Sequence, residues 1–314
     1  MLKYLIIPLA KNAVSFCYYD RVAGDAPLIE LDTLKKAILW AMKENLNVQF
    51  LYPDDPIPDE YAAAIDSIDH SSIVGSTCED KQLAESADVV IFDSWASINY
   101  DPFKREKSYV IRTSKEDFFD NVRLLKSILP NVDRLVVLIT NPHKFSSEDF
   151  GRYESTLDSL IPAIVEEYKN GHYVHFNLLT DRIFLENMNN CNAGDESITL
   201  APDGQFYACP AFYVDGGEPV GNLNDSVAIK NPQLYRLDHA PICRLCDAYQ
   251  CRRCVWLNQK TTLEINTPSH EQCVVSHIER NASKKLLDTL RSNGIFLSQN
   301  SIKSINYLDP FENI

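Results

Sequence analysis

The chain contains 314 residues, of which 30 are Lys or Arg and 44 are Asp or Glu, giving a formal net charge of −14. A field of this sign repels phosphate backbones and anionic lipid headgroups, so a general nucleic-acid-binding protein and a membrane-surface protein are excluded. Apolar residues make up 45% of the chain. This fraction can fill a substantial core, which excludes wholesale disorder.

The apolar segments of the chain are short. None approaches the roughly 20 uninterrupted apolar residues that a membrane-spanning helix requires. The first residues, MLKYLIIPLAKN, lack the small-residue cleavage pattern of a signal peptide and predict a buried first strand instead. We therefore predict a cytoplasmic protein that does not enter a membrane.

Strand-sized apolar runs alternate with longer amphipathic segments as far as about residue 182, a pattern typical of parallel strands covered by helices. The predicted strands are KYLIIPL (3–9), NVQFLYP (47–53), SSIVG (71–75), DVVIFD (88–93), SYVIRT (108–113), RLVVLIT (134–140) and YVHFNLL (173–179). Six or seven such units predict an α/β fold with a partial (βα)6-type barrel, because a full eightfold barrel usually takes about 250 residues.

Three of the segments between these strands predict helices. In residues 31–45 the apolar side chains Leu34, Ala37, Ile38, Ala41 and Met42 recur at helical spacing. Asp32 is the predicted cap of this helix. Residues 115–129 form the second predicted helix, and residues 146–171 form the third, with Ser146 or Ser147 as cap and Gly171 as its stop.

Polar side chains follow the predicted strands, at the edge where parallel sheets generally bind ligands. They are Asp54, Asp55, Asp93, Trp95, Arg112, Thr113, Asn141, His143 and Asn177. Most residues of this kind are polar simply because loops are solvated. Arg112 and His143 have the chemistry to grip a carboxylate or a peptide carbonyl, and with Asn141 they are the predicted peptide-binding residues.

Seven of the nine cysteines are concentrated between residues 191 and 273. They are Cys191, Cys209, Cys243, Cys246, Cys251, Cys254 and Cys273. Residues 197–214 alternate strand formers around Asp203-Gly204, which predicts a hairpin that brings the first two cysteines together. A CxxC pair suits a metal centre, because two intervening residues let both sulfurs reach it.

Iron–sulfur clusters, zinc and disulfides are the three interpretations of these cysteines. An odd count without an export signal argues against disulfides. A zinc ribbon usually separates its CxxC pairs by about 15–20 residues, whereas only four residues separate Cys246 from Cys251. Soft thiolates accept either metal, and His239, His270 or His277 could complete a mixed site. The alternatives that stay open are one or two [4Fe-4S] clusters or zinc.

The spacing Cys191-x12-Gly204-x4-Cys209, Cys243-x2-Cys246-x4-Cys251-x2-Cys254 and Cys273, followed by the segment HIERNASKKLLDTL, resembles the SPASM domain of radical SAM peptide-modifying enzymes. The family has gaps of five and three where this chain has four and two. The resemblance implies two auxiliary [4Fe-4S] clusters. Cys243, Cys246, Cys251 and Cys273 would hold one, and Cys191, Cys209 and Cys254 would hold part of the other.

The second cluster of such domains usually gains a further upstream cysteine. None stands between Cys78 and Cys191. The resemblance therefore implies an open iron or an oxygen ligand such as Asp181 or Glu186.

A working radical SAM barrel should carry a CxxxCxxC loop after its first strand, because three thiolates leave one iron free to chelate S-adenosylmethionine. Ala10, Val14 and Cys17 stand at these positions. The segment after the second strand, FLYPDDPIPDEY, also lacks the family's glycines. We therefore predict no cleavage of S-adenosylmethionine by this chain, and we interpret Cys17 as a small buried side chain near a strand end.

Residues 1–292 as a whole resemble the CXXX repeat peptide maturases. The runs KYLIIPL, VSFCYYD, LDTLKKAILWAMKENLNVQFLYPD and DSIDHSSIV carry this likeness together with the cysteine pattern. The expected organisation is a pseudo-radical-SAM partial barrel at 1–182, a small SPASM-like α+β metal-binding domain at 183–292 and a C-terminal tail at 293–314.

Two hypotheses of function follow from the resemblance. In the first, the chain matures a ribosomally synthesised cysteine-repeat peptide and holds metal in its C-terminal domain. In the second, it is a non-enzymatic adaptor that binds the precursor peptide, carries a structural zinc or iron–sulfur domain and serves a separate radical SAM enzyme. No local motif supplies the nucleophile and base that a stand-alone hydrolase would need.

Overall fold

The computed structural model describes residues 2–100, 103–185, 191–246, 251, 253–297 and 302. Its centre is a nine-stranded sheet in the order β7-β6-β5-β4-β3-β2-β1-β8-β9. Neighbouring strands are parallel except for the antiparallel pair β8 and β9. The strands are β1 (Tyr4–Pro8), β2 (Asn47–Leu51), β3 (His70–Gly75), β4 (Val89–Phe92), β5 (Ser108–Thr113), β6 (Arg134–Ile139), β7 (His175–Phe176), β8 (Ser197–Leu200) and β9 (Phe206–Tyr207), with a separate pair β10 (Gly221–Asn222) and β11 (Ser226–Val227).

Strands β1 to β7 coincide with the seven predicted strands. The last is the shortest, because the Thr180 hydroxyl accepts a hydrogen bond from the backbone N–H of Phe176 at 2.8 Å and the chain turns there into a helix. The hairpin predicted around Gly204 is also confirmed, since β8 and β9 pair antiparallel and Gly204 has a φ of +78°. Strand β8 pairs in parallel with β1, so this hairpin continues the main sheet.

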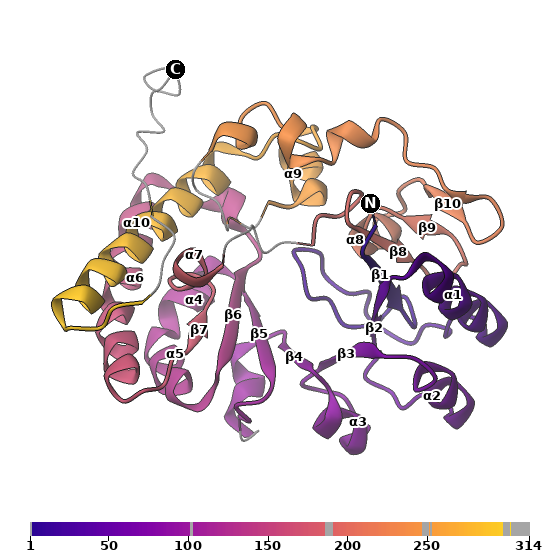
Figure 1. Cartoon of the computed structure of the whole chain (residues 1–314), viewed down its shortest axis with the longest axis horizontal. Helices are drawn as coiled ribbons and strands as arrows, with labels where there is room; N and C mark the ends of the chain where they lie inside the picture. The colour runs from indigo at the N-terminus through magenta and orange to yellow at the C-terminus, as the bar shows by residue number, and fades with distance from the viewer. Residues whose placement is uncertain are drawn as a thin grey trace.

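Helices cover the outer side of the curved sheet (Figure 1). They are α1 (Leu31–Glu44), α2 (Asp59–Ile65), α3 (Lys81–Ser86), α4 (Lys115–Asp120), α5 (Val122–Ile128), α6 (Ser147–Lys169) and α7 (Asp181–Phe184), followed in the C-terminal half by α8 (Pro210–Val214), α9 (Val255–Thr262) and α10 (His270–Ser292). Within these residues, no helix combines the length and the apolar character that crossing a membrane would need.

The helix predictions need three corrections. Helix α1 begins after Glu30 without a side-chain cap, and Asp32 lies inside its first turn. Met42 does not join the buried face of α1, because its side chain is 60% exposed. The second predicted helix is divided at Asn121 into α4 and α5. The third is confirmed as α6, capped by Ser146 in a capping box with Asp149.

The inner face of the sheet is filled by the loop that follows β1. Ala13 and Val14 pack there in one apolar cluster with the inward side chains Ile6, Leu51, Ile73, Ile91 and Val110. Val14 is fully buried, and its N–H donates to the Tyr52 carbonyl at 2.9 Å. Because Ala13 and Val14 pack inside the sheet, the next residues of the loop lie at the carboxyl edge of the strands.

The C-terminal half runs from one end of the sheet to the other. It begins at β8 beside β1 and ends with α10 packed along α6 (Figure 1). A buried network fixes this second contact, because Glu279 of α10 accepts hydrogen bonds from Arg182 at 2.9 Å and from Tyr153 at 2.8 Å. The predicted domain boundary lies between residues 182 and 183. The two parts of the chain on either side of it share one sheet and one hydrophobic core.

Candidate functional site

Arg112, at the end of β5, anchors the loop that carries Cys17. Its side chain is 5% exposed, and it donates from Nε to the carbonyl of Cys17 at 2.9 Å and from Nη2 to the carbonyl of Tyr19 at 2.6 Å. It also pairs with Asp93 and, at 3.1 Å, with Asp20. These contacts give Arg112 a positioning role for the loop, and its direct contact with a peptide stays a prediction.

Four cysteines from distant parts of the chain meet beside this loop. Cys209 and Cys254 belong to a small buried cluster with Tyr19 and Trp256, and Cys17 and Cys191 pack against it. We refer to Cys17, Cys191, Cys209 and Cys254 as the Cys17 set.

The thiols of the Cys17 set influence one another. A hydrogen bond with the Cys17 thiol, burial and the charges of the other thiols raise the pKa of Cys254 well above its ordinary value. Burial and then Cys17 raise the pKa of Cys191 to about 12. Burial, followed by the charges of Cys17 and Cys191, raises the pKa of Cys209 well above its ordinary value. Four thiols that suppress one another's ionisation form a donor set that a cation would convert to thiolates.

The remaining cysteines of the C-terminal half form a second group, which we call the Cys243 set: Cys243, Cys246, Cys251 and Cys273. Burial, followed by the charges of Cys243 and Cys246, raises the pKa of Cys251 and of Cys273 to about 12 in each case. The Cys246 sulfur also lies 3.8 Å from Nε2 of His277. The division of these cysteines between two metal centres stays a prediction from the resemblance, and the structure adds that Cys17 lies with Cys191, Cys209 and Cys254.

Arg253 lies between the two sets. Its positive charge opposes the rise in pKa that burial causes at Cys191 in one set and at Cys243 in the other. The side chain is buried, donates from Nη1 to the Tyr235 carbonyl at 3.0 Å and also hydrogen-bonds the Cys243 thiol. A buried cation that acts on both sets fits anionic thiolate-ligated metal at either of them.

All nine cysteines belong to the described part of the chain, and each is a free thiol there. Among the described residues, no group of three or more His, Cys, Asp or Glu side chains is arranged to hold a metal ion. Thiolate sites commonly reach their final geometry together with their metal. Metal at either set would therefore draw its ligands inward.

A cleft of about 860 Å³ lies next to the Cys17 set. It is lined by Tyr18, Tyr19, Asp20, Thr140, Asn141, His143, Lys144, Asp215, Trp256, Leu257, Lys260, Thr261, Ser269 and Glu271. These residues come from the loop after β1, the carboxyl end of β6, and the C-terminal half around α9 and the start of α10. The cleft is therefore formed jointly by both halves of the chain.

Two of the predicted peptide-binding residues line this cleft. His143 has a buried Nδ1 without a hydrogen-bond partner among the described residues, and burial lowers its pKa, which favours the neutral ring. Asn141 is already engaged, since its Oδ1 accepts from the N–H of Lys115 at 2.9 Å and its Nδ2 donates to Glu116 at 3.3 Å. Both side chains therefore line the cleft, and the amide of Asn141 is held by its own neighbours.

The opposite wall carries an aromatic side chain fixed by charged neighbours. Nε1 of Trp256 donates to Asp215 at 2.6 Å, and Lys260 pairs with Asp215 at 2.9 Å. The Lys260 ammonium also lies 5.7 Å from the centre of the Trp256 ring. This arrangement holds the indole in one orientation.

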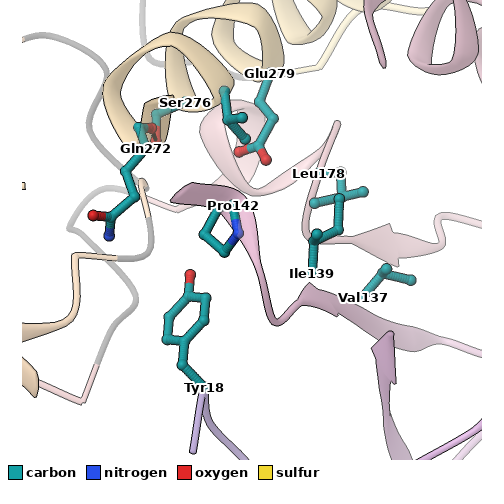
Figure 2. Close-up of a pocket in the computed structure, with 9 residues that line it drawn as sticks. Tyr18, Val137, Ile139, Pro142, Leu178, Gln272, Ser276 and Glu279 are labelled. Atoms are coloured by element: carbon teal, nitrogen blue, oxygen red, sulfur yellow. Dashed lines mark hydrogen bonds between the residues drawn. The ribbon is translucent and has the colours of Figure 1, made fainter. Parts of the chain in front are cut away.

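A smaller cavity of about 40 Å³ opens behind Tyr18, between β6 and α10. Figure 2 shows Val137 and Ile139 on one side and Gln272, Ser276 and Glu279 of α10 on the other. A space of this size holds one or a few water molecules. It is too small for a peptide side chain of ordinary size.

One of the two oxygen ligands suggested for the centre at Cys191, Cys209 and Cys254 is engaged elsewhere in the structure. Both carboxylate oxygens of Asp181 accept hydrogen bonds from Arg134. Glu186 lies outside the described residues. The sequence analysis did not include Cys17 in the set. The signal that could have indicated it was that seven cysteines are one too few for two sets of four.

No protein-family model matches this chain, and no curated protein matches it in sequence. In three dimensions it is similar to anSMEcpe, an anaerobic sulfatase-maturating radical SAM enzyme, in a structure with bound AdoMet. The TM-score is 0.61 at 12% identity over 93% of this chain and 100% of that chain. The structure of anSMEcpe with AdoMet and the Cp18Cys peptide gives 0.61 at 13% identity over the same shares.

Streptococcus suis SuiB bound to precursor peptide SuiA gives a TM-score of 0.42 at 13% identity over 78% of this chain and 67% of that chain. The likeness to anSMEcpe shows the fold: a mixed α/β chain with a large, mostly parallel sheet that matches radical SAM structures.

Proposed function

We propose that this chain takes part in the maturation of a ribosomally synthesised cysteine-repeat peptide, which it binds in the cleft beside thiolate-held iron–sulfur clusters. The observation that carries the proposal is the position of the cleft walls. Tyr18 to Asp20 follow Cys17 directly, and Trp256 follows Cys254 by two residues. Whatever the cleft binds therefore lies against segments that belong to the Cys17 set.

The cleft has the chemistry for an extended peptide. His143 lines the cleft with a ring whose neutral form is favoured and which can hydrogen-bond a backbone group, and the Trp256 ring offers an apolar face. Acidic Asp20 and Glu271 and basic Lys144 and Lys260 lie around it. Such mixed walls favour a zwitterionic peptide over a nucleic acid, in keeping with the net charge of −14.

The two thiol sets can hold metal close to the bound peptide. The Cys243 set and the Cys17 set would each surround one centre, with Arg253 between them offsetting the negative charge. A bound iron–sulfur cluster supplies one-electron redox chemistry near the substrate. The residues of this chain would orient the peptide and shield the centre at the Cys17 set from water, because that set lies among buried side chains.

We infer that the chain does not cleave S-adenosylmethionine by itself. Two of the three positions where cluster ligands would stand after β1 are Ala10 and Val14, and Val14 is buried in the inner apolar cluster. The third, Cys17, lies with thiols of the C-terminal half. The loop therefore contains no second thiol to share a cluster inside the sheet.

The second candidate function is that of a non-enzymatic adaptor for a radical SAM partner enzyme. The observation that favours it is the same apolar filling of the sheet interior by Ala13 and Val14. Mass spectrometry of the peptide after incubation with the isolated, metal-loaded chain and a reductant separates the candidates. Modification without a partner would reject the adaptor.

Peptide binding tests the proposed function through the variant His143→Ala. We expect isothermal titration calorimetry with a synthetic cysteine-repeat precursor peptide to show affinity about 5- to 20-fold weaker than for the wild-type chain, because one buried hydrogen bond is lost. His239→Ala is the matched control, since His239 is exposed and does not line the cleft. Equal affinities for wild type and both variants would reject this cleft as the peptide site.

A further inference from the structure

We propose that Cys17 is the fourth thiolate ligand of a metal centre that it shares with Cys191, Cys209 and Cys254. This inference deepens the proposed function and rests on it for the identity of the metal, a four-iron cluster. It assigns a metal-binding role to a loop that belongs to the N-terminal half. It also makes this centre a link between the two halves of the chain.

Contacts before and after Cys17 in the loop hold this residue at the site. Val14 is fixed inside the sheet and Arg112 binds the carbonyls of Cys17 and Tyr19, so the loop between them has little freedom. The Ser15 hydroxyl also donates to the Tyr19 carbonyl at 2.6 Å. The Cys17 side chain leaves this clamped loop toward the C-terminal half, where it packs on the cluster that contains Cys209 and Cys254.

The number of thiols supports the same assignment. With Cys17 included, eight cysteines form two sets of four, which is the ligand number of [4Fe-4S] clusters and of structural zinc sites. The ninth, Cys78, belongs to neither set. It follows β3, and its sulfur lies 3.7 Å from the carbonyl of Asp80.

A complete four-thiolate set changes what the centre can do. Every iron of a cluster held in this way has a protein ligand, so no coordination position is left for a substrate thiolate. The open iron implied by the family resemblance is thereby replaced by a closed centre, which stores or relays an electron or stabilises the fold. Asp181 is not needed as a ligand, in agreement with its pairing to Arg134.

The centre also shapes the cleft. Tyr18, Tyr19 and Asp20 line the cleft and follow Cys17 directly. On the other side, Trp256 and Leu257 follow Cys254. Metal bound by both cysteines would hold these two walls at a fixed separation.

The test is the metal content of the full-length chain and of alanine variants after anaerobic reconstitution with iron and sulfide. We expect about eight irons for the wild type and about four for Cys17→Ala, since one of two four-iron clusters is lost. The matched control Cys78→Ala should keep the wild-type content. Cys243→Ala should lose the other cluster and also retain about four irons. Far-UV circular dichroism verifies that each variant is folded.

Double variants show whether Cys17 and Cys254 serve one centre. Adding Cys254→Ala to Cys17→Ala should cause no further loss of iron, whereas adding Cys243→Ala should remove nearly all of it. A folded Cys17→Ala protein with the same metal content as Cys78→Ala would overturn the inference.

Zinc analysis of the same samples separates this inference from the proposed function. About two zinc ions in the wild type and about one in Cys17→Ala would uphold Cys17 as a ligand and reject the iron–sulfur clusters. A wild-type chain that binds neither iron nor zinc would reject both.

Discussion

Arg112 illustrates how one buried guanidinium organises the site. Its planar fork reaches two backbone carbonyls of the Cys17 loop and a carboxylate at once. Lysine carries the same charge but only one donor group on a flexible stem, so it cannot bind all three partners in this geometry. The residue thus connects the end of β5 to the thiols without touching them.

The variant Arg112→Lys tests this role. We expect it to lower the free energy of unfolding by about 2–3 kcal/mol, because buried acceptors lose charge-assisted hydrogen bonds. Urea unfolding followed by circular dichroism measures the change. Arg152→Lys is the control, since Arg152 is 55% exposed and its replacement should change stability by less than about 0.5 kcal/mol. Equal midpoints for the two variants would contradict the anchoring role.

The sequence could predict where Arg112 lies but not what it binds. Its place after a β-branched run located it at the carboxyl edge of the sheet, as the structure confirms. The carbonyls that it binds belong to residues more than ninety positions earlier in the chain. No local pattern reports such a contact. The sequence likewise predicted the position of His143 at the edge of the sheet, where it lines the cleft. It could not predict that the Nδ1 atom has no hydrogen-bond partner among the described residues.

Helix α6 shows how a local signal and a tertiary contact act on the same residue. Asp149 closes the capping box with Ser146 and also pairs with Lys115 at 2.5 Å. The hydrogen bond from Lys115 and the backbone N–H of Ser146 lower the pKa of Asp149 to about 2. Its ordinary value in an unfolded chain is about 3.9. The ionised form therefore stabilises the fold.

The pH dependence of this contribution follows from linkage. Because the folded-state pKa lies below the unfolded one, the stabilisation is complete above about pH 4 and is lost as the pH falls toward 2. Asp149→Asn should lower stability at pH 7 and flatten the decline between pH 4 and pH 2, as measured by urea unfolding. Glu166→Gln, an exposed site on the same helix, is the control. A wild-type decline retained in Asp149→Asn would contradict the assignment.

Prediction at the level of elements succeeded where the signal is local. The seven strands of the first half and the capped start of α6 follow from short-range patterns. The sequence also predicted the hairpin around Gly204, but not that β8 would pair with β1 across almost two hundred residues. Hydrophobic periodicity identifies a strand, and it does not identify a distant partner.

At the scale of the whole molecule, the C-terminal half connects the two ends of the sheet. It starts beside β1 and finishes with α10 on α6 (Figure 1). Seven of the eight cysteines in the two thiol sets belong to this half, and so do several residues that line the cleft. The Cys17 set alone receives a residue from the N-terminal half. Metal there would tie the first loop of the sheet to the cysteine-rich region and stabilise the arrangement that forms the cleft.

The Cys243 set could be grouped from the sequence through its resemblance, because all four members fall in the predicted metal-binding region. The Cys17 set could not be grouped in this way, because Cys17 lies far away in the sequence and meets the other three cysteines only in the folded chain. The division into domains at 182/183 and 292/293 stays a prediction. Most of the predicted tail at 293–314 lies outside the described residues.

The central claim is that two sets of thiolates hold iron centres, one of them beside the cleft, and anomalous diffraction at the iron absorption edge tests it most directly. Crystals of the anaerobically purified chain should give two iron peaks, one enclosed by Cys17, Cys191, Cys209 and Cys254 and one by Cys243, Cys246, Cys251 and Cys273. Crystals without an iron peak at either set, or with these sulfurs joined in disulfides, would contradict the account.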